Sequence, residues 1–167
     1  MEQAFAYQMN AFAPNQVAKG QLDLDVNLNN FAGVVDSTQT TALVPGDPVA
    51  IAGTTSKGLP HYIKAAEGSL VFGYVKWSAK QSSFSAGEMV EIASGGDVMY
   101  MEAGGALNAG VAVNFKIDSG TGAITLEAPG TSAGSTIGYT MEQATAAGDL
   151  VRVYLLAPVA YEASANA

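Results

Sequence analysis

Residues 85–92 read SAGEMVEI and residues 146–153 read AAGDLVRV. Both stretches contain, in the same order, a small residue, Ala, Gly, an acid, an apolar residue, Val, a charged residue and an apolar residue. The two glycines, Gly87 and Gly148, can adopt a positive φ angle because they lack a Cβ atom. The two stretches therefore predict the same local structure, a tight turn followed at once by a β-strand.

The residues after each glycine fit a strand with one buried face. The acids, Glu88 and Asp149, are expected at the exposed start of the strand. The core would then receive either Met89 and Leu150 or Val90 and Val151. Turn formation and burial together account for the shared residues, so the pattern indicates no catalytic role.

The similarity continues outside these two turns. Residues 43–58 match residues 107–122 at Leu, Gly and Val positions with an offset of 64 (107 minus 43). Phe72-Gly73-Tyr74 matches Ile137-Gly138-Tyr139 at an offset of 65 (137 minus 72). Because the blocks occur in the same order, we interpret them as an internal duplication of a β unit of roughly 60 residues. The alternative is chance similarity between stretches rich in Gly, Ala and Val.

The rest of the chain is also typical of β-structure. Leu22, Leu24 and Val26 alternate with polar residues, which is the period of a strand with one buried face. Clusters of Gly, Ser, Asp and Pro separate such segments about every eight to twelve residues. We therefore expect an all-β fold, a small β-barrel or sandwich built from two similar β lobes. The expected parts are an extended N-terminal arm (1–20), a first lobe (21–102), a second lobe (103–160) and a C-terminal tail (161–167).

The composition excludes several classes of partner and site. The net charge of −8 repels phosphate backbones and anionic membranes, so neither nucleic acid nor a membrane is an expected partner. The absence of cysteine excludes disulfides and thiolate metal sites. The sequence shows no secretory signal and no apolar run that could span a bilayer, so we expect a soluble protein made in a cytoplasm.

Catalytic chemistry finds little support in the sequence. His61 is the single histidine, and its neighbours Lys57 and Lys64 bring no carboxylate, whereas a triad needs a base and an orienting acid. A glycosidase needs two carboxylates facing one cleft. Glutamates are dispersed along the chain, among them Glu67, Glu88, Glu91, Glu102 and Glu127. We predict no catalytic, cofactor-binding or metal-binding residue.

The segment around Trp77 raises the question of a sugar site. Trp77, Tyr74 and Lys76 could form a stacking patch for a sugar ring. Strand alternation, however, places Trp77 on the same face as Val75 and away from Tyr74 and Lys76. This pattern favours a half-buried core position for Trp77.

The strand expected at residues 22–28 raises the question of a calcium site. Asp23 and Asp25 lie on one face of that strand, together with Asn27 and Asn29. Oxygen ligands on one face could recruit calcium, but calcium loops usually curl around the ion. A solvated strand face is therefore the preferred interpretation.

The first 20 residues differ from the rest of the chain. They lack strand alternation, carry several aromatic side chains and contain little charge. Because a free tail is seldom this aromatic, we expect the arm either to dock on another chain or to cover its own lobes. The candidate contact residues are Phe5, Tyr7, Met9 and Phe12.

Four stretches in order carry a resemblance to a known family. They are APNQVAKGQLDLDVN (13–27), TALVPGDPVAIAG (41–53), GSLVFGYVKWSAKQSSFSAGEMVEIASGG (68–96) and IGYTMEQATAAGDLVRVYLLAP (137–158). An arm, a Leu-x-Pro-Gly-Asp-x-Val phrase and Gly-Tyr and Ala-Gly-acid phrases resemble the structural cement, or head decoration, proteins of tailed bacteriophages. The long, twice-repeated body departs from the family pattern, and it is consistent with two barrel lobes or with one larger barrel.

The resemblance implies a non-enzymatic protein without a cofactor. Such proteins sit on the outside of the virion capsid, commonly as homotrimers, and bridge neighbouring subunits of the major capsid protein after the shell expands. Many weak contacts, repeated over the shell, would add binding free energy that exists only in the expanded state.

Two other classes of function stay open. A head-fibre or host-binding module that recognises sugars would need an exposed aromatic platform, such as Trp77. A hydrolase or lyase would need His61 or a pair of carboxylates in a cleft.

Overall fold

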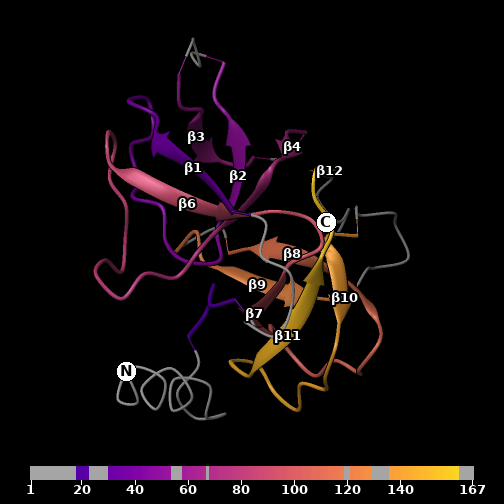
Figure 1. Ribbon diagram of the computed structural model, residues 1–167. Helices are drawn as coiled ribbons and strands as arrows, with labels where there is room; N and C mark the ends of the chain where they lie inside the picture. Colours follow the sequence, from indigo (N-terminus) through magenta and orange to yellow (C-terminus); the bar gives the residue numbers. More distant parts are fainter. Residues whose placement is uncertain are drawn as a thin grey trace, which may run out of the picture.

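The computed structural model describes residues 18–22, 30–53, 58–66, 68–118, 121–128 and 136–161 of the chain. Within these residues the chain forms strands and no helix, which confirms the expected all-β fold. The strands are β1 (Asn30–Val35), β2 (Pro48–Ile51), β3 (His61–Lys64), β4 (Leu70–Val71), β5 (Gly73–Val75), β6 (Met89–Ala93), β7 (Val98–Glu102), β8 (Ala112–Ile117), β9 (Ile124–Glu127), β10 (Gly138–Thr140), β11 (Leu150–Leu155) and β12 (Val159–Ala160). In Figure 1, β1–β4 and β6 form an upper group and β7–β11 a lower group.

The upper group contains a closed barrel, which we call the first lobe. Its strand order is β1-β3-β2-β5-β6, and it closes because β1 pairs with β6 on one side and, in parallel, with β3 on the other. Gly33 permits close packing inside the barrel, since a Cβ atom there would overlap the ring of Tyr62. The interior is filled by Val35, Leu43, Val49, Tyr62, Val75, Phe84, Val90 and Ile92.

The lower group is a five-stranded sheet, which we call the second lobe. Its strand order is β7-β11-β10-β8-β9. Matched in chain order, β7, β8, β9, β10 and β11 correspond to β1, β2, β3, β5 and β6. The order in the second lobe is then the same as the order β1-β6-β5-β2-β3 around the barrel of the first lobe. The closing contact also recurs. Val35 pairs in parallel with Tyr62 in the first lobe, and Ala103 forms a parallel bridge with Leu126 in the second. The common order and register are those of an internal duplication.

The two turns that repeat in the sequence have the same backbone geometry. Gly87 and Gly148 have φ angles of 85° and 90°. The following acid accepts a hydrogen bond from the backbone N–H three residues before it, at 2.6 Å for Glu88 and 3.0 Å for Asp149. Of the two expected alternatives, the residues that enter the core are Val90 and Val151.

Two further turns use the same hydrogen bond. The carboxylate of Asp47 accepts from the N–H of Val44 at 3.0 Å, and that of Asp97 accepts from the N–H of Ser94 at 3.1 Å. A glycine with positive φ precedes the acid in both, as it does at Glu88 and Asp149. A glycine followed by an acid therefore precedes four of the described strands, β2, β6, β7 and β11.

The described residues of the expected arm belong to the fold. The N–H of Gly20 donates to the carbonyl oxygen of Tyr100 in β7 at 2.7 Å, and Leu22 forms a bridge with Met99. The expected boundary between the lobes, at residues 102 and 103, falls after β7, whereas β7 pairs with β11 in the second lobe. The strand pairing thus divides the lobes at the turn between β6 and β7.

One hydrophobic core connects the two lobes. Residues on the outer face of the first lobe are buried against the interior of the second: Ala50, Ala65, Val71, Tyr74 and Ala93. Tyr161, from the expected C-terminal tail, packs on Phe115 with ring centroids 4.2 Å apart. Just before it, β12 pairs with β4 in a separate two-stranded sheet. The second lobe therefore relies on other parts of the chain to bury its core.

Candidate functional site

His61 has a carboxylate neighbour, contrary to the sequence prediction. Its Nδ1 lies 3.1 Å from Oδ2 of the buried Asp36. The prediction was wrong because Asp36 directly follows β1, and the parallel pairing of β1 with β3 brings it to His61. The other oxygen of Asp36 accepts hydrogen bonds from the N–H and the hydroxyl of Thr38, at 2.9 and 2.7 Å. The pair therefore stabilises the barrel where it closes.

A group of charges made of the buried Asp47 and two partly buried lysines lies between the lobes. Lys64 Nζ lies 3.1 Å from Asp47 Oδ1 and donates to the carbonyl oxygen of Gly122 at 2.9 Å. Lys19 Nζ donates to the carbonyl oxygen of Ile124. Burial lowers the pKa of Lys19 from its ordinary value, and nearby carboxylates oppose that shift. Both lysines reach backbone carbonyls of the second lobe, so the group ties that lobe to the first lobe and to the arm.

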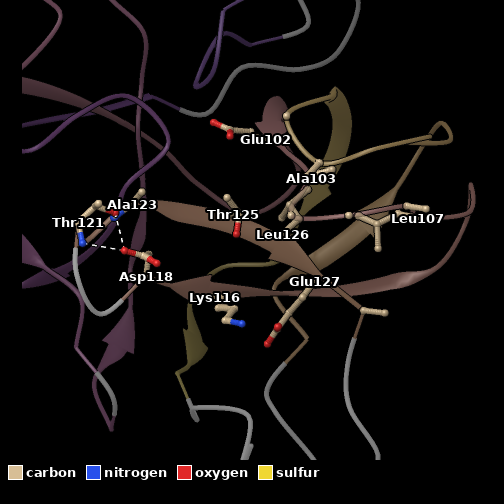
Figure 2. A pocket seen from close by; sticks show the side chains of 16 residues that line it. Glu102, Ala103, Leu107, Lys116, Asp118, Thr121, Ala123, Thr125, Leu126 and Glu127 are labelled. Atoms are coloured by element: carbon tan, nitrogen blue, oxygen red, sulfur yellow. Dashed lines mark hydrogen bonds between the residues drawn. The ribbon is translucent and has the colours of Figure 1, made fainter.

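A hollow of about 570 Å³ in the second lobe carries several ionisable side chains. In Figure 2, the carboxylates of Glu102 and Glu127 point in different directions from opposite sides of the hollow. Asp118 accepts hydrogen bonds from the N–H and the hydroxyl of Thr121, both at 2.7 Å, so it organises the β8–β9 turn. In this view Glu102 and Glu127 do not face one point, whereas a glycosidase needs two carboxylates that face one cleft.

Metal ligands do not gather in the part of the chain that the structure describes. No group of three or more His, Cys, Asp and Glu side chains that could hold an ion occurs among those residues. Asp23 and Asp25, the candidate calcium ligands, lie outside the described residues, as do Phe5, Tyr7, Met9 and Phe12 of the candidate arm contacts.

Trp77 is exposed, with 45 % of its surface accessible, so the predicted core position is wrong. The reason is that β5 ends at Val75, and strand alternation does not extend to residue 77. Trp77 adjoins a second hollow of about 390 Å³. The polar side chains that line this hollow are Lys76, Ser78, Lys80, Gln81 and Glu91, with Lys76 Nζ 2.8 Å from Glu91 Oε2.

Two other surfaces expose large apolar or aromatic side chains. On the first lobe, Phe31 and Ile51 are exposed, and the ring of Phe31 meets that of Phe72 edge to face at 5.5 Å between centroids. On the second lobe, Tyr139 and Tyr154 are exposed and lie directly opposite each other on β10 and β11. Hydrophobic periodicity did not identify either surface, because the exposure of these residues depends on how the two lobes pack against each other.

Comparison with known proteins gives no family assignment. Neither a protein-family profile nor a curated protein sequence matches this chain. Among the described residues, no helix is long and apolar enough to cross a membrane.

Proposed function

We propose that this protein is a capsid decoration protein. It binds the outer surface of an expanded tailed-bacteriophage head, bridges neighbouring subunits of the major capsid protein as a homotrimer, and stabilises the shell. The proposal rests first on the four ordered stretches that resemble the cement proteins. All four contribute strands or turns to an all-β fold with a closed barrel, and a small β-barrel is what that resemblance implies; the second lobe departs from the family pattern.

The observation that carries the proposal is the distribution of exposed apolar side chains on a tightly packed β scaffold. A protein that bridges subunits needs separate contact surfaces, and aromatic side chains are the usual anchors of such contacts. Exposed aromatic or large aliphatic side chains occur on both lobes and include Phe31, Ile51, Leu59, Trp77, Tyr139, Met141 and Tyr154. A scaffold whose parts are tied together by partly buried lysines loses little conformational entropy when it docks.

The test is co-sedimentation of the purified protein with heads assembled from the major capsid protein of the same phage genome. We expect retention on expanded heads, no retention on unexpanded heads, and a higher temperature of head disruption when the protein is bound. Absence of binding to both kinds of head would contradict the proposal.

A shortened chain tests the arm separately. Removing residues 1–17 deletes Phe5, Tyr7, Met9 and Phe12 but keeps Gly20, whose N–H donates to the carbonyl oxygen of Tyr100 in β7. We expect lower occupancy on expanded heads. A full-length variant with serine at these four positions is the matched control for arm length, and we expect it to show the same loss.

The exposure of Trp77 favours a second candidate, a sugar-binding module. An aromatic face beside a polar hollow matches the way in which proteins hold a sugar ring, with the ring stacked and its hydroxyls bonded to polar groups. Gln81 and Glu91 supply such groups here. Trp77, for which strand alternation predicted a core position, is thus exposed and available to a ligand.

The chain has one tryptophan, so its fluorescence reports on this hollow alone. Titration with oligosaccharides from the bacterial envelope should give a saturable change in emission if the module binds sugars. Gln81→Ala should weaken that change, and calorimetry with Trp77→Ala should show no binding. An emission spectrum insensitive to every oligosaccharide would exclude the second candidate.

A further inference from the structure

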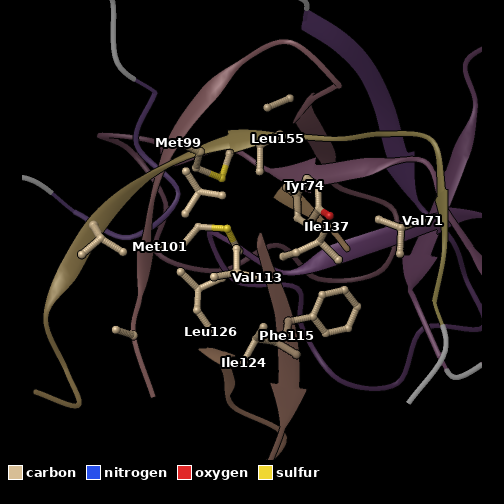
Figure 3. Close-up of a cluster of buried hydrophobic side chains, with 14 of the residues drawn as sticks. Val71, Tyr74, Met99, Met101, Val113, Phe115, Ile124, Leu126, Ile137 and Leu155 are labelled. Carbon is tan, nitrogen blue, oxygen red and sulfur yellow. The ribbon is translucent and has the colours of Figure 1, made fainter. Parts of the chain in front are cut away.

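The open end of the second lobe is covered within the chain. Met99, Phe115 and Ile137 of the second lobe belong to the same core as Tyr74 of the first lobe and are 0 %, 1 % and 0 % exposed. Figure 3 shows Tyr74 of the first lobe directed towards Ile137 and Leu155. The outer face of the first lobe therefore covers the open end of the second.

The strand registers identify the corresponding end of the first lobe. Phe31 is equivalent to Met99, because Phe31 pairs with Ile92 as Met99 pairs with Val153. Ile51 is equivalent to Phe115, because Ile51 pairs with Tyr62 as Phe115 pairs with Leu126. Phe72 corresponds to Ile137 at the offset of 65. These counterparts, Phe31, Ile51 and Phe72, form what we call the Phe31 surface.

The Phe31 surface is uncovered where its counterpart is buried. Phe31 and Ile51 are 43 % and 45 % exposed, and Phe72 is only partly buried. Ile51 shares the inward direction of the buried Val49, two residues earlier in β2, and is exposed because it lies at the open end of the barrel. The first lobe thus has an apolar surface equivalent to that of the second, and no strand of the described residues covers it.

The covering face has a counterpart as well. Tyr74 pairs with Ala93 on the first lobe, and Tyr139 pairs with Tyr154 at the equivalent place on the second. Tyr74 and Ala93 are both 0 % exposed, whereas Tyr139 and Tyr154 are 45 % and 42 % exposed. We call Tyr139 and Tyr154 the Tyr139 surface. It is the face equivalent to the one with which the first lobe covers the second.

We infer that the Tyr139 surface of one copy of this chain covers the Phe31 surface of a second copy. The contact continues from copy to copy the interface that already joins the two lobes inside the chain. Both surfaces are exposed in a single chain, so they do not cover each other within it. Because the two surfaces differ, the association is head to tail and gives a ring if the rotation closes.

This inference deepens one part of the proposed function, the self-association, but does not require a capsid. Two lobes in each of three copies would place six similar lobes in one ring. A failure of the chain to bind phage heads would leave the head-to-tail contact untouched.

The test begins with sedimentation equilibrium of the full chain over a series of concentrations. We expect reversible assembly of the wild type. The Tyr139→Ser/Tyr154→Ser variant and the Phe31→Ser/Ile51→Ser variant should each raise the apparent dissociation constant at least about tenfold. Met89→Ser, which removes an exposed apolar side chain from the opposite end of β6, is the control and should assemble like the wild type.

Mixing the two double variants provides the decisive measurement. Each variant lacks one of the two surfaces, so neither should assemble with itself. Together they retain one intact pair of surfaces and should form a heterodimer that grows no further, which also shows that both variants are folded. A monomeric wild type at every concentration, assembly unaffected by either double variant, or a mixture that forms no heterodimer would each overturn the inference.

Discussion

The two lobes have the same strand order and register but differ in how they fill their interiors. Tyr62 and Phe84 fill the first lobe, and the equivalent positions in the second lobe hold the smaller Leu126 and Ala144. The first lobe accordingly buries its own core, whereas the core of the second lobe includes Tyr74 from the first. The comparison teaches that the repeated turns preserve a backbone topology, while the sizes of a few side chains decide whether a lobe is self-sufficient.

The largest expected effect comes from the matched tyrosines. Tyr74→Ala should lower the free energy of unfolding by about 3–5 kcal/mol because it empties the contact between the lobes. Tyr139→Ala, at the equivalent exposed position, should change it by about 0.5 kcal/mol or less in dilute protein. Urea unfolding measures both, and equal losses would contradict the asymmetry between the lobes.

Tyr74→Phe is the control for the hydroxyl group. The hydroxyl of Tyr74 is buried with no hydrogen-bond partner among the described residues, and burial raises its pKa. Removing it should leave stability unchanged or raise it by about 1 kcal/mol.

The matched glycines of β5 and β10 should show the next largest effect, and here the lobes should behave alike. A Cβ atom at Gly73 would overlap the carbonyl oxygen of Ala93, and one at Gly138 would overlap that of Tyr154. Gly73→Ala and Gly138→Ala should each destabilise the protein by about 2–3 kcal/mol, because backbone atoms must move. Thermal unfolding tests this, and a silent substitution at either site would show that the lobes pack differently there.

The turn glycines should show a smaller effect of a different origin. Gly87 and Gly148 have open space where a Cβ atom would lie, so alanine meets no neighbour and only the positive φ is unfavourable. Each substitution to alanine should reduce the free energy of unfolding by about 1 kcal/mol. Losses as large as those at Gly73 would mean that the turns are packed rather than open.

The smallest expected effect is the pH dependence due to Asp149. Hydrogen bonds from the N–H and hydroxyl of Thr145, at 2.7 and 2.8 Å, and from the N–H of Ala146 lower its pKa from the ordinary value of 3.8. A lowered folded-state pKa gives a stabilisation that is complete above the unfolded-state pKa and is lost as pH falls through the folded-state value. The difference in melting temperature between the wild type and Asp149→Asn should therefore shrink in acid. A difference that stays constant down to about pH 2 would contradict this assignment.

The sequence predicted the parts of the fold that depend on local geometry. The turns at Gly87 and Gly148 and the strands that follow them could be predicted because a turn glycine and a strand period are local properties. The sequence left open whether Met89 and Leu150 or Val90 and Val151 enter the core, and the structure places the two valines there. The proximity of His61 to Asp36 could not be predicted, since it depends on a parallel pairing between distant strands.

Two other features depend on where strands end and how lobes meet. Trp77 was assigned to the core because alternation was extended past the end of β5. The Phe31 and Tyr139 surfaces could not be predicted from hydrophobic pattern, because each is formed by residues that are buried at the equivalent place in the other lobe.

The turn that joins β6 to β7 has a mechanical consequence. It consists of Ser94–Asp97, is held by the bond from the Ser94 N–H to Asp97, and has no room for a Cβ atom at Gly95 beside the carbonyl oxygen of Ala157. So short and crowded a connection gives the molecule no hinge. Tension applied to one lobe therefore passes directly to the other. A molecule held at both ends would resist extension as one rigid body.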